Sequence, residues 1–155
     1  MIVLALDLGS KCGFALGDSE HPLRVTVSGV ANCQPGRFEG PGMRLIRLEL
    51  FLKQTFAAFT VGHVVVEEVR RHIGVDAAHV YGALLGAVQA FCDKREPRVS
   101  YHGVPVGTIK KFATGKGNAG KPDMIEAVRQ WGFKPVDDNE ADAIALLRCV
   151  LHDFK

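Results

Sequence analysis

The sequence predicts one α/β domain, residues 1–155, with a mixed five-stranded sheet flanked by helices. Three observations lead to this prediction. Five short apolar or β-branched runs alternate with segments of helical periodicity, in the order three strands, helix, strand, helix, strand and three helices. Strands in close succession favour antiparallel pairing, whereas strands joined through helices favour parallel pairing. No repeat or linker divides the chain, and its length suits one domain with its own core.

The first three strands are expected near the N-terminus. Residues 2–6 are continuously apolar and end at Asp7, which indicates a buried strand running into a turn. Short strands are expected at Gly13–Leu16 and Arg24–Val30, and the turn residues between the strands favour an antiparallel meander. A loop rich in Gly and Pro should follow over residues 32–42.

The rest of the chain alternates helix and strand and then becomes mostly helical. Apolar residues at helical spacing predict a helix over residues 41–59, and a β-branched run predicts a strand over His63–Val69. A helix rich in small side chains is expected over residues 76–93, followed by a strand over Val99–Val104.

Three helices should close the chain. The first, over residues 106–112, is short and leads into a glycine-rich loop over residues 114–120. The second, over residues 122–132, begins with a proline that suits a first helical turn. The third is expected from residue 137 or 138 to about residue 152.

The composition is typical of a globular cytoplasmic protein. Four cysteines are widely spaced without a CxxC pair, which argues against a zinc ribbon and for reduced thiols in or near the core. We identify no apolar run of the roughly 18 residues that a membrane span needs, and the N-terminus lacks the features of a signal peptide. We therefore expect a cytoplasmic protein with no membrane partner.

One segment of the chain is strongly basic. Between Arg98 and Lys134, seven basic residues accompany two acidic ones, so this segment carries +5 and the remainder −3. The basic residues are Arg98, Lys110, Lys111, Lys116, Lys121, Arg129 and Lys134. Such a segment favours a polyanionic partner, with a solvated lysine-rich face as the alternative.

Three carboxylates lie where apolar residues are expected. Asp7 ends the first buried strand, Glu67 ends the β-branched strand, and Asp142 lies on an apolar face of the last helix. Carboxylates rarely lie among apolar neighbours unless they are paired or bind a metal, so we expect the three to converge. A turn cap, a strand-end ion pair and a satisfied helix carboxylate are the respective structural alternatives.

Periodicity bears on the neighbours of these acids. Successive strand residues point to opposite sides, so only one of Glu67 and Glu68 can face the first-strand aspartate. Asp138 and Asn139 lie one helical turn before the last-helix aspartate. Asp138 is the better hard-metal ligand, and Asn139 is the alternative through its carbonyl oxygen.

Oxygen ligands without a cluster of His or Cys favour Mg²⁺, with Mn²⁺ able to substitute. An acidic cluster beside a basic segment is what metal-assisted phosphodiester hydrolysis needs, because lysines can hold the flanking phosphates. The sequence therefore predicts a metal-dependent nuclease.

Four segments together resemble the RuvC family of Holliday-junction resolvases. They are IVLALDLGSKCGFAL, VVVEEV, VPVGTIKKFATGKGNAGKPDMIEAV and DDNEADAIALL, in the family's order and spacing. The DxG motif alone is weak, because actin-like kinases also carry it, but the combination is specific. The compact loops and the DDNEADA ending resemble the phage-type branch of the family.

The resemblance implies an RNase H-like fold, a homodimer, and Mg²⁺-dependent paired incision of four-way DNA junctions that leaves 5′-phosphate ends. Asp7, Glu67 and Asp142 match three of the family's catalytic acids. The fourth acid commonly lies where this chain has Asn139, and in some relatives where it has Asp138, so the fourth ligand stays open between the two.

The resemblance also bears on the lysines. Lys121 resembles a family lysine near the catalytic site, and Lys110, Lys111 and Lys116 are candidate DNA contacts. Two alternatives remain open: another RNase H-like nuclease acting on flaps, single strands or RNA, and a catalytically inactive junction-binding protein.

Overall fold

The computed structural model describes residues 1–154, and its five strands and five helices follow the predicted order. In chain order they are β1 (Ile2–Asp7), β2 (Lys11–Asp18), β3 (Val27–Asn32), α1 (Gly42–Ala58), β4 (Val61–Glu68), α2 (Val75–Asp93), β5 (Ser100–Pro105), α3 (Val106–Thr114), α4 (Lys121–Gln130) and α5 (Asp138–Asp153).

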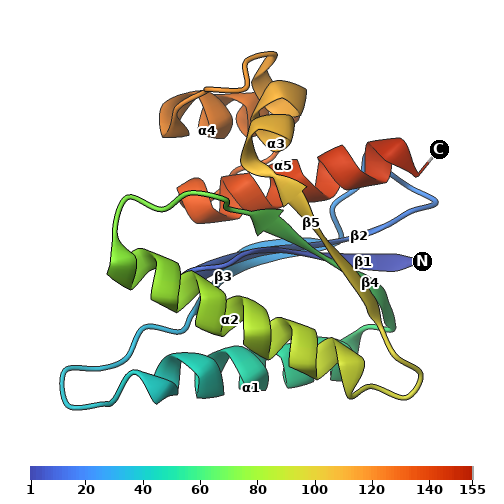
Figure 1. Ribbon diagram of the computed structural model, residues 1–155. Helices are drawn as coiled ribbons and strands as arrows, with labels where there is room; N and C mark the ends of the chain where they lie inside the picture. Colours follow the sequence, from blue (N-terminus) through green and yellow to red (C-terminus); the bar gives the residue numbers. More distant parts are fainter. Residues whose placement is uncertain (155) are drawn as a thin grey trace.

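The strands form one mixed sheet in the order β3-β2-β1-β4-β5. Strands β1, β2 and β3 pair antiparallel as the expected meander, whereas β4 runs parallel to both β1 and β5. Helices α1 and α2 cover one face of the sheet, and α5 covers the other, with α3 and α4 packed beside it (Figure 1). The predicted fold class is confirmed.

Strand β1 lies in the middle of the sheet and separates two hydrophobic cores. Val3 and Ala5 face α5, whereas Leu4 and Leu6 face α1 and α2, and all four are fully buried. Burial on both faces explains why the strand reads as a continuous apolar run. The same alternation turns Asp7 toward the α5 side, where the strand ends.

Strands β2 and β3 differ most from their predicted ranges. Strand β2 runs from Lys11 to Asp18 because it pairs along its length with β1 on one side and β3 on the other. Strand β3 begins at Val27 and not at Arg24. Val25 packs against the α5 core although it lies outside the strand. Its apolar side chain extends the alternation of the sequence beyond the strand, which is why the strand was predicted to begin earlier.

Helix α2 bears on the expectation that the chain has no membrane partner. It has 19 residues, and an 18-residue window within it has a mean hydropathy of 1.2, so by length and composition alone it could cross a membrane. A single helix of this kind is weak evidence for a span. Its Leu84, Val88 and Cys92 pack into the core that α1 shares. All four cysteines are free and buried, as expected.

Candidate metal centre

Two neighbouring parallel strands place the first two acids of the candidate site. The register of β1 and β4 pairs Leu6 with Val66, so the next residues, Asp7 and Glu67, leave the sheet side by side. Alternation along β4 turns Glu67 to the α5 side together with Val65. Glu68 points the other way, where it forms an ion pair with Arg70 at 3.3 Å. The choice of Glu67 over Glu68 agrees with this geometry.

Helix α5 brings the third acid over the strand ends. Asp142 lies one turn inside the helix, on the face that packs against the sheet, and one ligand oxygen each of Asp7, Glu67 and Asp142 lies within 4.8 Å of the others. All three side chains are partly buried. The structure thus brings together the three carboxylates that the sequence singled out.

A glycine fixes how closely α5 approaches the sheet. A Cβ atom at Gly13 in β2 would lie 1.9 Å from the carbonyl oxygen of Asn139, so only glycine allows this contact. Glu140, buried next to it, accepts hydrogen bonds from the Ser28 hydroxyl and the Val136 N–H, each at 2.7 Å. The beginning of the helix is thereby locked onto β2 and β3.

The Asp137 side chain caps α5 by accepting a hydrogen bond from the Glu140 N–H at 3.0 Å. The Asn139 amide donates to the other Asp137 oxygen at 3.2 Å. Asp138 forms an ion pair with Lys121 at 2.9 Å. Neither candidate for the fourth ligand therefore belongs to the three-acid cluster in this structure.

The three acids repel one another in a poorly solvated site. Burial, followed by the charges of Glu67 and Asp142, raises the pKa of Asp7 well above its usual range. Burial raises the pKa of Glu67, and burial together with Glu67 raises the pKa of Asp142 to about 7. The positively charged side chains nearby are therefore too few or too distant to balance three ionised carboxylates at this site.

This donor set fits a divalent cation. Three converging carboxylate oxygens are hard ligands, and a cation between them would replace mutual repulsion by attraction. The basic residues nearby do not take its place: Lys110 and Lys121 both lower the pKa of Asp142, yet that pKa stays near 7.

The lysines lie at different distances from the cluster. Lys110 in α3 is half-buried and close enough to lower the pKa values of both Glu67 and Asp142. Lys121, at the start of α4, reaches the edge of the cluster through Asp138 and keeps 77% of its side chain exposed. Lys111 and Lys116 are exposed on α3 and on the loop after it.

One residue near the site was missed in the sequence. The Tyr81 hydroxyl in α2 donates a hydrogen bond to the backbone carbonyl of Glu67 at 2.7 Å. A contact between a side chain and a distant backbone carbonyl leaves no periodic signal. A tyrosine among the small residues of this helix was the available hint in the sequence.

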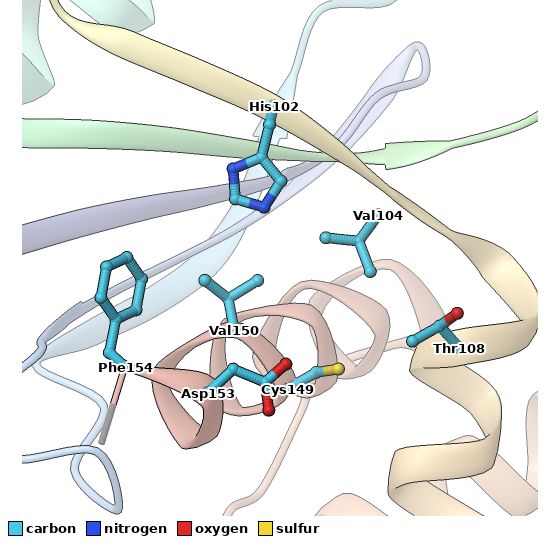
Figure 2. Close-up of a pocket in the computed structure, with 7 residues that line it drawn as sticks. All are labelled: His102, Val104, Thr108, Cys149, Val150, Asp153 and Phe154. Atoms are coloured by element: carbon cyan, nitrogen blue, oxygen red, sulfur yellow. The ribbon is translucent and has the colours of Figure 1, made fainter.

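A cavity lies at the other end of the α5 face. It has a volume of about 230 Å³ and opens between β5 and the C-terminal turns of α5 (Figure 2). Its lining residues are His102, Val104, Thr108, Cys149, Val150, Asp153 and Phe154. None of the three clustered carboxylates lines it, so the candidate metal centre, at the ends of the inner strands β1 and β4, lies outside this cavity.

Comparison with known proteins identifies the fold. No protein-family model matches the sequence, and no curated protein matches it significantly. Among solved structures, RuvC of Thermus thermophilus in complex with a Holliday junction substrate is similar, with a TM-score of 0.80 and 24% identity over 96% of this chain and 92% of that one. A second Thermus thermophilus RuvC structure gives a TM-score of 0.75 and 24% identity over 99% and 94% of the two chains.

A eukaryotic protein shares the same architecture. The yeast mitochondrial Holliday junction resolvase superposes with a TM-score of 0.66 and 12% identity, over 96% of this chain and 78% of that one. The fold is therefore the RNase H-like fold of these resolvases, as the sequence resemblance implied.

Proposed function

We propose that this chain is a divalent-metal-dependent endodeoxyribonuclease that cuts four-way or otherwise branched DNA junctions in the cytoplasm. The observation that carries the proposal is the convergence of Asp7, Glu67 and Asp142 within 4.8 Å on a fold shared with RuvC. That Thermus thermophilus protein was solved with a Holliday junction substrate. The basic segment beside the acids supplies the charge that DNA requires.

In the proposed mechanism the three acids hold the metal. Mg²⁺, or Mn²⁺ in its place, would polarise the scissile phosphate and activate water. Asp7, Glu67 and Asp142 would hold it together, because their ligand oxygens lie within 4.8 Å of one another. Hydrolysis would break the bond between phosphorus and the 3′ oxygen, leaving a 5′-phosphate and a 3′-hydroxyl.

Asp138 is our candidate for the fourth ligand. Its charge helps to raise the pKa values of Asp7 and Asp142, so it lies within electrostatic reach of the cluster. Asn139, by contrast, is hydrogen-bonded to the Asp137 cap. Asp138 would have to exchange its Lys121 partner for the metal, which would leave Lys121 free to stabilise charge on the phosphate.

The basic side chains would guide the DNA to the acids. Lys110 and Lys121 lie nearest the cluster and would contact the phosphates beside the cut, whereas Lys111 and Lys116 would contact the backbone further away. Contacts of this kind position the substrate without reading its sequence. They fit a nuclease that selects DNA by its branched shape.

A homodimer is part of the proposal, because two symmetric cuts suit a two-fold enzyme. Helix α2 offers a surface for it. Gly82, Ala83, Gly86 and Ala90 lie exposed along one side of the helix, and a Cβ at either glycine would meet nothing within 4 Å. Small side chains on a flat apolar face allow two helices to approach closely.

A panel of labelled substrates tests the proposed function: a four-way junction, a flap, a duplex, a single strand and an RNA–DNA hybrid. We expect Mg²⁺-dependent cleavage of the junction above the others, with 5′-phosphate ends. Preferred cleavage of flaps, single strands or RNA would assign the chain to another nuclease class. Junction binding without any cleavage would make it a binding protein.

A further inference from the structure

The end of strand β4, which carries Glu67, is paired with one neighbouring strand only. Its ladder with β1 ends at Leu6 and Val66, whereas Glu67 still pairs with Val104 in β5 and Glu68 with Pro105, which has no N–H to donate. At the same point three carboxylates are held together against their mutual repulsion. A contact from outside the sheet would help to fix the backbone here.

Tyr81 supplies such an anchor. Its hydroxyl donates to the Glu67 carbonyl oxygen at 2.7 Å and accepts a hydrogen bond from the Val69 N–H at 3.3 Å. One side chain thus holds the backbone on both sides of Glu68. Its ring also packs against His72, with centroids 5.0 Å apart, in the loop that follows the strand.

The anchor is itself rigid. Tyr81 lies one turn before Leu84 in α2, and Leu84 and Val88 are almost fully buried in the core beneath the helix. Glu67 is therefore held through its backbone by a helix whose inner side chains are buried in the core.

We propose that Tyr81 is a positioning residue that fixes the Glu67 backbone and thereby sets the affinity of the three-acid cluster for a divalent cation. This inference rests on the proposed function. Residues behind metal ligands typically change metal affinity by about 10- to 100-fold when they are altered, and Tyr81 acts through the backbone, so we expect the lower end of this range.

The test compares Tyr81→Phe with Tyr101→Phe. The first substitution keeps the aromatic ring in α2 and removes only the hydroxyl. The control makes the same change in β5, where the Tyr101 hydroxyl donates to Asp93 at 3.2 Å, away from the acids. Mn²⁺ binding would be measured by electron paramagnetic resonance without DNA, and junction cleavage would be followed against Mn²⁺ concentration.

For Tyr81→Phe we expect Mn²⁺ binding about tenfold weaker and a half-saturating concentration raised to match, with cleavage at saturating Mn²⁺ within about twofold of the unaltered chain. Tyr101→Phe should leave both quantities unchanged. The inference is overturned if the two variants bind Mn²⁺ alike, or if Tyr81→Phe lowers only the melting temperature and the maximal rate. If the unaltered chain neither binds Mn²⁺ nor cuts junctions, the proposed function itself fails.

Discussion

At the scale of single residues, Asp142 illustrates how the fold changes the chemistry of a carboxylate. Helix α5 carries it to the strand ends, where burial and Glu67 raise its pKa to about 7. In water an aspartate at neutral pH would be fully ionised. In this site ionisation opposes folding, and a bound cation would offset that cost, so the proposed metal binding would be linked to pH and stability.

The linkage has a definite sign. Asp142 titrates near 7 in the folded chain and at its ordinary value, 3.8, when unfolded, so the folded state holds a proton that the unfolded state releases. In chelator we therefore expect this group to lower stability as pH rises from about 4 to about 7. Thermal unfolding across this range measures it, and Asp142→Asn should reduce the dependence to the part that the raised pKa values of Asp7 and Glu67 contribute.

The same substitution should separate stability from metal binding. At pH 8 in chelator, Asp142→Asn removes a buried charge and should stabilise the chain by roughly 1–2 kcal/mol. In Mg²⁺ we expect the unaltered chain to gain stability and the Asp142→Asn variant to gain none. Asp153→Asn, at the exposed end of the same helix, is the matched control. Equal stabilisation by Mg²⁺ in both variants would contradict the assignment of Asp142.

The fourth ligand can be tested in the same way. Asp138→Asn should weaken Mn²⁺ binding by about tenfold, because it removes a charged ligand, whereas Asn139→Ala should change it by less than about twofold. Calorimetric titration of both variants decides between them. If Mn²⁺ binding is weakened only in Asn139→Ala, the fourth metal ligand is Asn139 and not Asp138.

At the scale of elements, the strand ends were predictable because a buried strand needs apolar residues, so its end is marked in the sequence by the first charged residue. Strands β1 and β4 are apolar runs closed by an acid, and two-residue alternation turned Asp7 and Glu67 to one side. Strand β3 was placed too early because Val25 packs on the core without pairing. The sequence did not decide between Asp138 and Asn139, since both lie one turn from Asp142. Their directions are set by an ion pair of Asp138 with Lys121 and a hydrogen bond from Asn139 to Asp137.

The close contact between β2 and α5 at Gly13 could not be predicted from the sequence. A substitution at Gly13 tests how much stability depends on it. Gly13→Ala would place a Cβ against the Asn139 carbonyl and push α5 from the sheet. We expect a loss of roughly 1–3 kcal/mol of unfolding free energy and a fall in metal affinity, because Asp142 moves with the helix. The loss would be measured by urea unfolding.

Gly42→Ala is the control for this effect, since a Cβ at Gly42 meets nothing within 4 Å at the start of α1. It should leave stability unchanged or slightly higher. If Gly13→Ala were as well tolerated, α5 would not depend on this close approach.

At the scale of the whole molecule, the exposed side of α2 concerns assembly. Gly86 lies on this side with open space around it, so Gly86→Glu should leave the chain folded and place a charge in the proposed dimer contact. Light scattering should give twice the 16.8 kDa chain mass for the unaltered protein and the chain mass for the variant. Ala57→Glu, exposed on α1, should stay dimeric.

If the unaltered protein is a monomer at micromolar concentration, the proposed dimer is wrong. It would leave the metal centre untouched, because Asp7, Glu67 and Asp142 all come from one chain. The two proposals can therefore fail independently.

The central claim is that Asp7, Glu67 and Asp142 form a metal centre that cuts branched DNA. The most direct measurement is cleavage of a synthetic four-way junction with mapped product ends, in Mg²⁺ and in chelator, by the unaltered chain and by Asp7→Asn. We expect paired cuts with 5′-phosphate ends in Mg²⁺, no cleavage in chelator, and a rate at least about a hundredfold lower for Asp7→Asn. Equal cleavage by Asp7→Asn, or cleavage undiminished in chelator, would rule out this metal centre as the site of the reaction.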